Sequence, residues 1–309
     1  MISEFRPGEP WPDTDGIPVN AHGGGFLHHE DVWYWYGEFK TAGTEGNVAQ
    51  VGISCYSSRD LYNWKNCGIA LPVSEEPGAP LERGCIMERP KVLFNEQTRK
   101  FVMWLHLERK GQGYSSAEVA VAVGDTPTGP FHFHRAFRPN GQMSRDMTLF
   151  KDEQGVAWQL RSSEENATLH IARLTEDYLD CGPDYVRAFE DGWLEAPAII
   201  HHEGWYHLVG SYCTGWRPNA CRHAVARSVE GPWKELINPC VGPHNGLTFH
   251  SQSTFLLNPP GSNQVIYVGD RWNPEDAVSG TYVWLPIRLS PDGAEMRWFD
   301  RWRLEQSPV

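Results

Sequence analysis

Three carboxylates occupy positions where acid–base chemistry is plausible. Glu88, Asp146 and Glu195 each stand at the head of an apolar run whose pattern predicts a buried strand. Burying a charge without a partner is costly, so a carboxylate at such a position is a candidate for function. Pro197 cannot donate to a sheet ladder, so Glu195 lies at a strand start or a sheet edge. Arg145 stands beside Asp146, and we expect it to lower the pKa of Asp146 and keep it ionised.

The segment around Glu195 belongs to a phrase that recurs along the chain. Each copy has a polar residue, an apolar strand, a polar turn and an aromatic-rich return strand. The polar marker residues are His22, Glu88, Asp146, Glu195 and Gln252. The recurrence of this pattern, at the spacing of these markers along an all-β chain, predicts propeller blades. The sequence therefore predicts an all-β fold, a five-bladed β-propeller whose five markers surround an axial active-site pocket.

The remaining organisation of the chain is simple. No Gly/Ser-rich linker or charge run divides residues 1–309, so we expect one propeller domain. Residues 1–19 contain four prolines and no alternating pattern, which predicts an irregular N-terminal arm that packs on the end of the barrel. The three glycines 23–25 predict a close approach of the backbone to another group, which is either simple crowding or a ligand.

Composition narrows the classes of partner. A net charge of −12 argues against nucleic acid and anionic membranes, and no apolar run approaches the ~18 residues of a membrane span. Seven scattered cysteines without a CxxC motif predict free, buried thiols. The first residues lack the pattern of a signal peptide. We expect a cytoplasmic monomer, or a secreted or periplasmic one if a leader has been removed.

Several other side chains are candidates for binding a ligand. Tyr114 follows the second return strand, in a loop that should cover the axis, and Arg271 follows the fifth. Trp216 lies in a Gly- and Pro-bearing loop, where it is either a platform for sugar stacking or part of a lid. His22 and His250 either line the axial channel, structurally or around a cation, or are core histidines with satisfied hydrogen bonds. No cofactor is required by these patterns, and structural Ca²⁺ at the axis is left open.

Together these motifs resemble the glycoside hydrolases of family 43. The resemblance rests on Glu88 in MERPKV, Asp146 in SRDMTLF, Glu195 in LEAPAI, and on TGWRPN and HSQSTF. The resemblance extends from about residue 20 to residue 287. Within the family, the motifs more narrowly resemble the branch that contains exo-β-1,3-galactanases. It implies a five-bladed propeller and inverting hydrolysis of a glycosidic bond. Glu195 would be the general acid, Asp146 would hold the pKa and orientation of that acid, and Glu88 would bind sugar hydroxyls.

The chemistry of the residues agrees with this resemblance. Glycoside cleavage needs an acid with a raised pKa and, for inversion, a base that activates water. Glu195 has apolar neighbours and fits the acid. Arg89 and Lys91 follow Glu88 and offer it a structural ion pair as an alternative role.

The chain departs from the wider family at one position. That family places an aspartate base at the start of blade one, where this chain has Asn20-Ala21-His22-Gly23. The galactanase-like branch also lacks the aspartate, so the departure favours the narrower resemblance. Gln252 is the candidate to hold the attacking water, through an unusual tautomer or by positioning alone, and Glu88 is its competitor.

Three functions remain open from the sequence. The first is an exo-acting glycosidase that releases galactose from β-1,3-galactan in arabinogalactan-type chains. The second is another family 43 specificity, a β-galactosidase, arabinofuranosidase or galactofuranosidase. The third is a non-catalytic propeller that binds carbohydrate, which the missing base favours and the three carboxylates disfavour. In each case the expected partner is an oligo- or polysaccharide.

Overall fold

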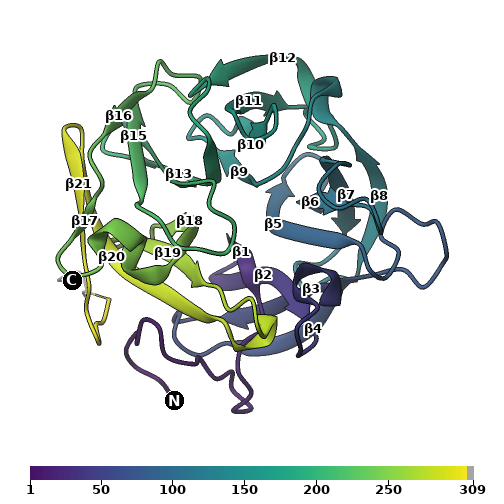
Figure 1. Ribbon diagram of the computed structural model, residues 1–309, viewed down its shortest axis with the longest axis horizontal. Helices are drawn as coiled ribbons and strands as arrows, with labels where there is room; N and C mark the ends of the chain where they lie inside the picture. The colour runs from purple at the N-terminus through teal and green to yellow at the C-terminus, as the bar shows by residue number, and fades with distance from the viewer. Residues whose placement is uncertain (305–309) are drawn as a thin grey trace.

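The computed structural model describes residues 1–304 and consists of five sheets arranged around one axis, antiparallel except for one parallel pair of strands in the last sheet (Figure 1). The predicted five-bladed propeller is confirmed. In each sheet the strand that contains the marker residue, or directly follows it in the third blade, lies innermost, and the chain then moves outward strand by strand. In four of the blades the last strand therefore lies at the rim, and the fifth blade has one additional outer strand, which precedes its inner strand in the sequence.

The first three blades follow one another in the sequence without a crossover. Blade one contains β1 His22–His29, β2 Val32–Lys40, β3 Gln50–Ser58 and β4 Lys65–Pro72. Blade two contains β5 Ile86–Asn95, β6 Lys100–Glu108, β7 Glu118–Gly124 and β8 Phe131–Phe137. Blade three contains β9 Met147–Lys151, β10 Ala157–Ser163, β11 Thr168–Leu174 and β12 Cys181–Ala188.

The last two blades differ in how they end. Blade four contains β13 Leu194–His202, β14 Trp205–Tyr212, β15 Arg222–Ala226 and β16 Lys234–Leu236. Blade five contains β17 Cys240–Val241, β18 Gln252–Leu257, β19 Val265–Arg271, β20 Thr281–Ser290 and β21 Gly293–Arg297. Its fifth, outermost strand, β17, pairs in parallel with β21. Blade five is thus built entirely from the C-terminal part of the chain.

Among the described residues, helical structure is confined to four short 3₁₀ turns between strands. They are η1 Gly46–Ala49, η2 Pro139–Gly141, η3 Asn245–His250 and η4 Ala277–Ser279. Within residues 1–304, no helix has the length and apolar character that crossing a membrane requires. All seven cysteines are free thiols, as predicted, and five of them are buried.

A repeated backbone irregularity directs the marker side chains. The residues that follow the markers in β1, β5 and β13 are Gly23, Arg89 and Ala196, with φ of 60°, 56° and 53°. In each strand the ladder register shifts at this point. A bulge bends its strand and re-aims the neighbouring side chain. Left-handed φ is uncommon for residues other than glycine. Its presence at Arg89 and Ala196 means that the surrounding structure holds the backbone in an unfavourable conformation at these two positions.

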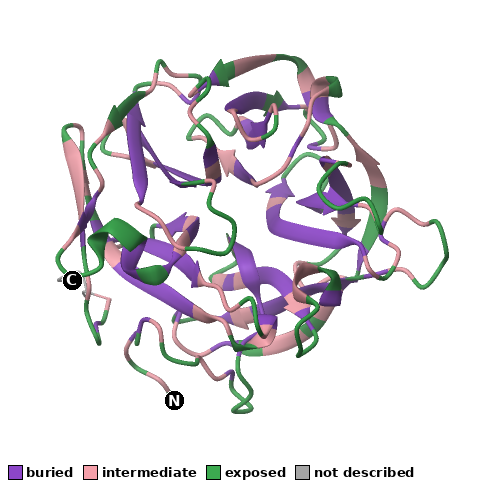
Figure 2. Cartoon of the chain, viewed as in Figure 1, coloured by how far each residue is buried: buried purple, intermediate pink, exposed green. Residues whose placement is uncertain are grey.

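The cores lie between neighbouring blades, where the inner strands are buried on both faces (Figure 2). The core between blades five and one is strongly aromatic, and Trp35, Trp64 and Trp284 are each at most 1% exposed. Aromatic side chains bury large areas and favour edge-on contacts, which dominate here. This packing joins the first blade to the last.

The N-terminal arm also contributes to this junction. Residues 1–19 contain isolated bridges and no extended strand, and Phe5 bridges Trp302. The ring of Phe5 stacks on that of Trp302 with centroids 4.3 Å apart, and it contacts Tyr62 at 4.5 Å. Phe5 therefore ties the start of the chain to blade one and to the segment after β21.

Replacing Phe5 with alanine tests this tie. Because Phe5 is 1% exposed, we expect Phe5→Ala to lower the free energy of unfolding by roughly 3 kcal/mol or more. The matched control is Ile17→Ala in the same arm, where the side chain is 60% exposed and the effect should stay within about 0.5 kcal/mol. Equal effects of the two substitutions in denaturant titrations would contradict a closing role for Phe5.

Candidate active site

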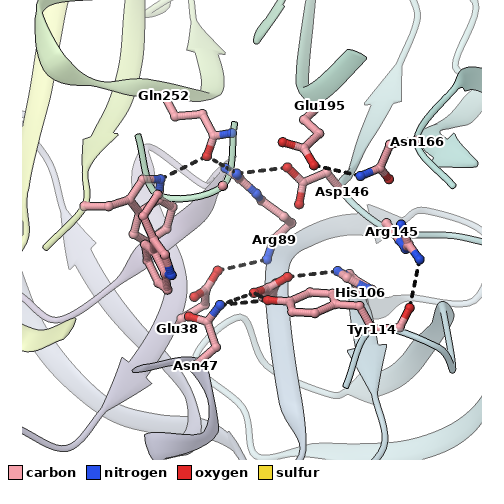
Figure 3. A pocket seen from close by; sticks show the side chains of 14 residues that line it. Glu38, Asn47, Arg89, His106, Tyr114, Arg145, Asp146, Asn166, Glu195 and Gln252 are labelled. Carbon is pink, nitrogen blue, oxygen red and sulfur yellow. Dashed lines mark hydrogen bonds and ion pairs between the residues drawn. The ribbon is translucent and has the colours of Figure 1, made fainter. Parts of the chain in front are cut away.

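A polar pocket opens on the propeller axis, at the ends of the inner strands where the markers lie (Figure 3). Its volume is about 280 Å³, near the lower end of the size range of small-molecule sites. Six of the predicted residues line it. They are Glu88, Tyr114, Asp146, Glu195, Trp216 and Gln252.

The buried guanidinium of Arg89 lies in the middle of this pocket and joins several blades. Its Nη2 lies 3.0 Å from Asp146 Oδ2 and donates to Gln252 Oε1 at 2.6 Å. Its Nη1 donates to the carbonyl of Ser253 at 3.1 Å, and its backbone N–H donates to Glu38 Oε1 at 3.2 Å. A buried arginine needs such a complete set of partners, because leaving a buried charge unpaired is strongly destabilising.

Glu195 has the environment of a general acid. Burial and the neighbouring Asp146 carboxylate together raise the pKa of Glu195 to about 7. Asn166 Nδ2 donates to Glu195 Oε1 at 2.7 Å and fixes the orientation of the carboxyl group. Asp146 is held in turn by the backbone N–H of Ala196, which donates to Oδ2 at 3.0 Å. Glu195 thus has a carboxyl group that can be protonated near neutral pH and points into the pocket.

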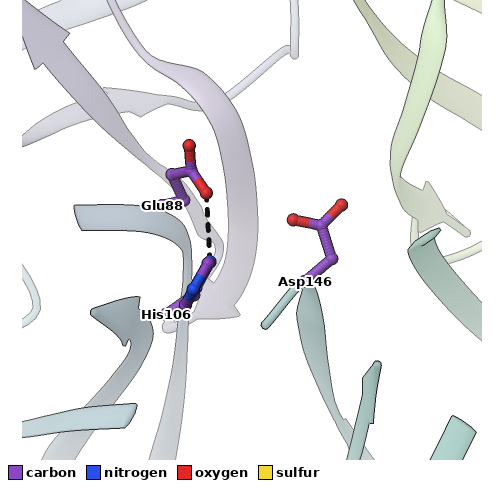
Figure 4. Close-up of side chains that lie close together, drawn as sticks. All are labelled: Glu88, His106 and Asp146. Atoms are coloured by element: carbon purple, nitrogen blue, oxygen red, sulfur yellow. Dashed lines mark ion pairs between the residues drawn. The ribbon is translucent and has the colours of Figure 1, made fainter. Parts of the chain in front are cut away.

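Glu88 has the opposite environment. Its Oε1 accepts hydrogen bonds from Asn47 and Tyr114, both at 2.7 Å, and its Oε2 lies 3.0 Å from His106 Nδ1 (Figure 4). Burial by itself would raise the pKa of Glu88, but its contact with His106 outweighs this and lowers the pKa to about 2. Burial also opposes the charged form of His106, yet Glu108 and Glu88 raise the pKa of His106 to about 9. Glu88 is therefore a fixed anion that suits hydroxyl binding.

These residues do not fit an axial metal ion. Ligand atoms of Glu88, His106 and Asp146 lie within 4.8 Å of one another. However, both ring nitrogens of His106 face carboxylates, and Asp146 is paired with Arg89. A protonated imidazole has no lone pair for a metal. The positive charge beside these carboxylates comes from the side chains of Arg89 and His106.

Gln252 is held in one orientation. Its Oε1 accepts from Arg89 Nη2 and from Trp272 Nε1, the latter at 2.9 Å, and its Nε2 donates to Ser211 Oγ at 2.9 Å. Arginine and tryptophan can only donate, so the amide oxygen must face them. Both lone pairs of this oxygen are committed, which leaves one amide N–H to face the pocket.

Two expectations about charge pairing are wrong. Arg145 pairs with Glu165 at 2.5 Å and not with Asp146, whose partner is Arg89. Likewise, Arg89 and Lys91 do not pair with Glu88. The bulge at Arg89 turns its side chain toward Asp146, and Lys91 Nζ donates to the carbonyls of Gly23 and Gly24. Glu88 and Arg89 are adjacent in β5, where neighbouring side chains point to opposite faces, so sequence proximity is a poor guide to their pairing.

His22 and Arg271 lie outside the pocket, contrary to expectation. The ring of His22 is 1% exposed, lies 3.0 Å from Asp270 and stacks on Tyr282, so these partners hold it in the core. Arg271 Nη2 donates to the carbonyl of Phe249 and the guanidinium lies over Trp298, so Arg271 lines an adjoining cavity instead. His250 pairs with the neighbouring His244 and does not line the pocket either. Trp216 lies at the rim, 37% exposed, in edge contact with Trp272.

Sequence reasoning missed several residues that line the pocket. They are Glu38, Asn47, Arg89, Asn166 and Trp272. Glu38 and Lys40 alternate in an otherwise apolar strand, and this pair of buried charges was a detectable signal. Asn47 and Asn166 lie in connecting segments, where the sequence gives no indication of direction.

Comparisons with known proteins agree with this geometry. Residues 23–293 match the family model described as glycosyl hydrolases family 43. The structure is similar to a family 43 β-1,3-galactosidase solved with galactodeoxynojirimycin, with 45% identity, a TM-score of 0.94, and 97% of this chain and 100% of that chain covered. It is also similar to an exo-β-1,3-galactanase from Phanerochaete chrysosporium solved with β-1,3-galactotriose, with 33% identity, a TM-score of 0.89, and 98% and 69% covered.

A curated relative is more distant. A xylosidase/arabinosidase from Humicola insolens is 20% identical over 238 residues, which are 71% of this chain and 43% of that protein. The chain therefore spans less than half the length of this relative.

Titration of Glu195 tests the electrostatics of the site directly. In ¹³C NMR of protein labelled at the glutamate carboxyls, a signal lost in Glu195→Gln should titrate near pH 7. Asp146→Asn should lower this pKa, because it removes the negative charge that disfavours ionisation of Glu195. Titration of Glu195 near its ordinary value of 4.5 would contradict the assignment of a buried acid.

Proposed function

Since this chain belongs to glycosyl hydrolase family 43, we propose that it is an inverting, exo-acting enzyme that releases galactose from the ends of β-1,3-galactan chains. The observation that carries the proposal is the pair formed by Glu195 and Asp146 in the axial pocket, in a structure whose 45% identical relative is a β-1,3-galactosidase. The 33% identical relative is an exo-β-1,3-galactanase.

Glu195 provides the acid of this reaction. A carboxyl group with a pKa of about 7 is largely protonated at and below neutral pH, so it can give its proton to the glycosidic oxygen as the bond breaks. Above that pH the fraction of protonated enzyme falls, and cleavage of natural linkages should fall with it. Asp146 accepts a hydrogen bond from the backbone N–H of Ala196, the residue after Glu195. It maintains both the position and the raised pKa of the acid.

The other pocket residues bind and orient the sugar. Glu88, with Asn47 and Tyr114, presents fixed acceptors and donors for hydroxyl groups. Trp216 at the rim offers an aromatic face or edge to a second sugar unit. The free N–H of Gln252 can hold a hydroxyl or a water, but its oxygen has no lone pair left to take a proton. Gln252 is therefore a positioning residue in this mechanism.

Hydrolysis of a defined panel tests the proposed substrate. The wild-type protein should release galactose as the monosaccharide from β-1,3-galactan and should leave internal linkages intact, as measured by chromatography of the products over time. Cleavage of arabinofuranosides, galactofuranosides or xylosides in place of galactosides would overturn the specificity. No cleavage of any glycoside would favour a carbohydrate-binding propeller.

The acid variant gives a sharper result within the same panel. Glu195→Gln should slow release of galactose from β-1,3-galactan by roughly 10²- to 10⁴-fold, the usual contribution of a general acid. The leaving group of a dinitrophenyl galactoside needs no proton, so the same substitution should slow hydrolysis of this substrate far less. Asn166→Ala is the matched control at the same carboxyl group, because it removes a hydrogen bond and leaves the acid in place. Equal losses on both substrates with Glu195→Gln would remove Glu195 from the role of acid.

A further inference from the structure

A series of aromatic side chains extends outward from the pocket along the junction of blades three and four. It consists of Phe189, Trp193, Tyr212 and Trp233, and we call it the aromatic track. Trp193 and Tyr212 are 50% and 47% exposed, and exposed apolar surface of this kind marks binding sites when it is contiguous. Resting on the proposed function, we propose that the aromatic track binds the galactan chain beyond the bond that is cleaved.

The inner end of the track lies beside the acid. Trp193 comes two residues before Glu195, and Tyr212 comes directly after Ser211, the ladder partner of Glu195. Both aromatic residues therefore lie at the end of the propeller where the pocket opens. Tyr212 also leads into the loop whose Trp216 lines the pocket. The track is thus continuous with the wall of the pocket.

The outer end of the track reaches a groove on the side of the propeller. The guanidinium carbon of Arg222 lies 5.0 Å from the ring centroid of Tyr212 and 5.8 Å from that of Phe189. The rings of Phe189 and Trp233 have centroids 6.1 Å apart. These two rings line a groove of about 710 Å³ between β12 of blade three and β16 of blade four. The four aromatic residues therefore connect the pocket with this groove.

The backbone around Phe189 and Trp193 is held in a conformation that displays their side chains. Both residues have a φ of 52°. The backbone N–H of Gly192 donates to the carbonyls of Phe189 and Ala167, each at 2.9 Å, and Arg222 donates to the carbonyl of Gly192. Left-handed φ is unfavourable for these residue types and is concentrated at functional sites. Burial of Trp193 offsets little of this strain, because half of its surface stays exposed.

The position of the acid determines which part of the substrate reaches the track. Glu195 gives its proton to the oxygen of the leaving group, so the leaving chain begins beside Glu195. Glu195 belongs to blade four and accepts a hydrogen bond from Asn166, which lies between β10 and β11 of blade three (Figure 3). An exo-acting enzyme holds the terminal galactose in its pocket. The rest of the chain therefore extends over the junction of these two blades, where the track lies.

The chemistry of the surface fits a neutral polysaccharide. Aromatic rings offer large flat apolar faces on which the C–H faces of sugar rings can pack. Arg187, Glu230 and Glu235 line the groove and present donors and acceptors for hydroxyl groups. The net charge of −12 disfavours an anionic partner. A galactan chain carries no charge and has both an apolar face and hydroxyl groups.

A comparison of short and long substrates tests the track. Trp193→Ala and Tyr212→Ala should each raise KM on β-1,3-galactan by roughly fivefold or more, the usual effect of truncating an aromatic residue at the centre of an interface. On a dinitrophenyl galactoside, which does not reach beyond the pocket, both variants should keep kcat/KM within about twofold of the wild type. The wild type itself should show a kcat/KM that increases with the length of β-1,3-galacto-oligosaccharides.

Phe133→Ala is the matched control, because Phe133 is 38% exposed in β8 of blade two, and it should change neither substrate. Equal losses on both substrates in Trp193→Ala and Tyr212→Ala would overturn the proposal in favour of a structural role. An unchanged KM on galactan would also overturn it. If these variants instead turn a dimer into a monomer in sedimentation velocity, the surface joins two copies of the chain.

The wild type separates this proposal from the one on which it rests. If it cleaves neither the aryl galactoside nor galactan, the proposed function is overturned and the role of the track with it. If it cleaves both but its kcat/KM does not depend on chain length, the proposed function stands and only the role of the track is overturned.

Discussion

The buried guanidinium of Arg89 is the interaction on which the rest of the site depends. It extends from blade two to Asp146 of the blade-three segment and to Gln252 and Ser253 of blade five. Its backbone N–H reaches Glu38 of blade one. Asp146 and Gln252 contact blade four in turn, through Ala196 and Ser211. Because a buried charge is tolerated only with its full set of partners, closing the ring and forming the pocket are coupled.

This arrangement gives neighbouring carboxylates opposite properties. Glu195 lies against Asp146 in a buried position, and its pKa rises to about 7. Glu88 faces a histidine that two carboxylates keep protonated, and its pKa falls to about 2. Environments that separate the pKa values of nearby acids are how one site provides both a proton donor and a fixed anion. Arg89, Lys40 and His106 supply the positive charge that holds these carboxylates at the axis.

The sequence was sufficient for the parts of the fold that are periodic. The recurring phrase placed Glu88, Asp146, Glu195 and Gln252 at the starts of inner strands, and all four line the pocket. It failed where direction depends on long-range partners. His22 occupies a marker position, but Asp270, which lies 248 residues away, draws its ring into the core. The bulge after Glu88 reverses the expected pairing of Arg89, and no local pattern predicts which blade will offer the partner.

The anomeric form of the first product tests the account most directly. A propeller with one protonated acid at the axis and a water held across the sugar cleaves a β-linkage with inversion. In ¹H NMR spectra recorded early in the hydrolysis of β-1,3-galactan, the α-anomer of galactose should appear first, and the β-anomer should follow by mutarotation. If the β-anomer appears first, a covalent intermediate is implied, and the assignment of an acid with a separate base would be contradicted.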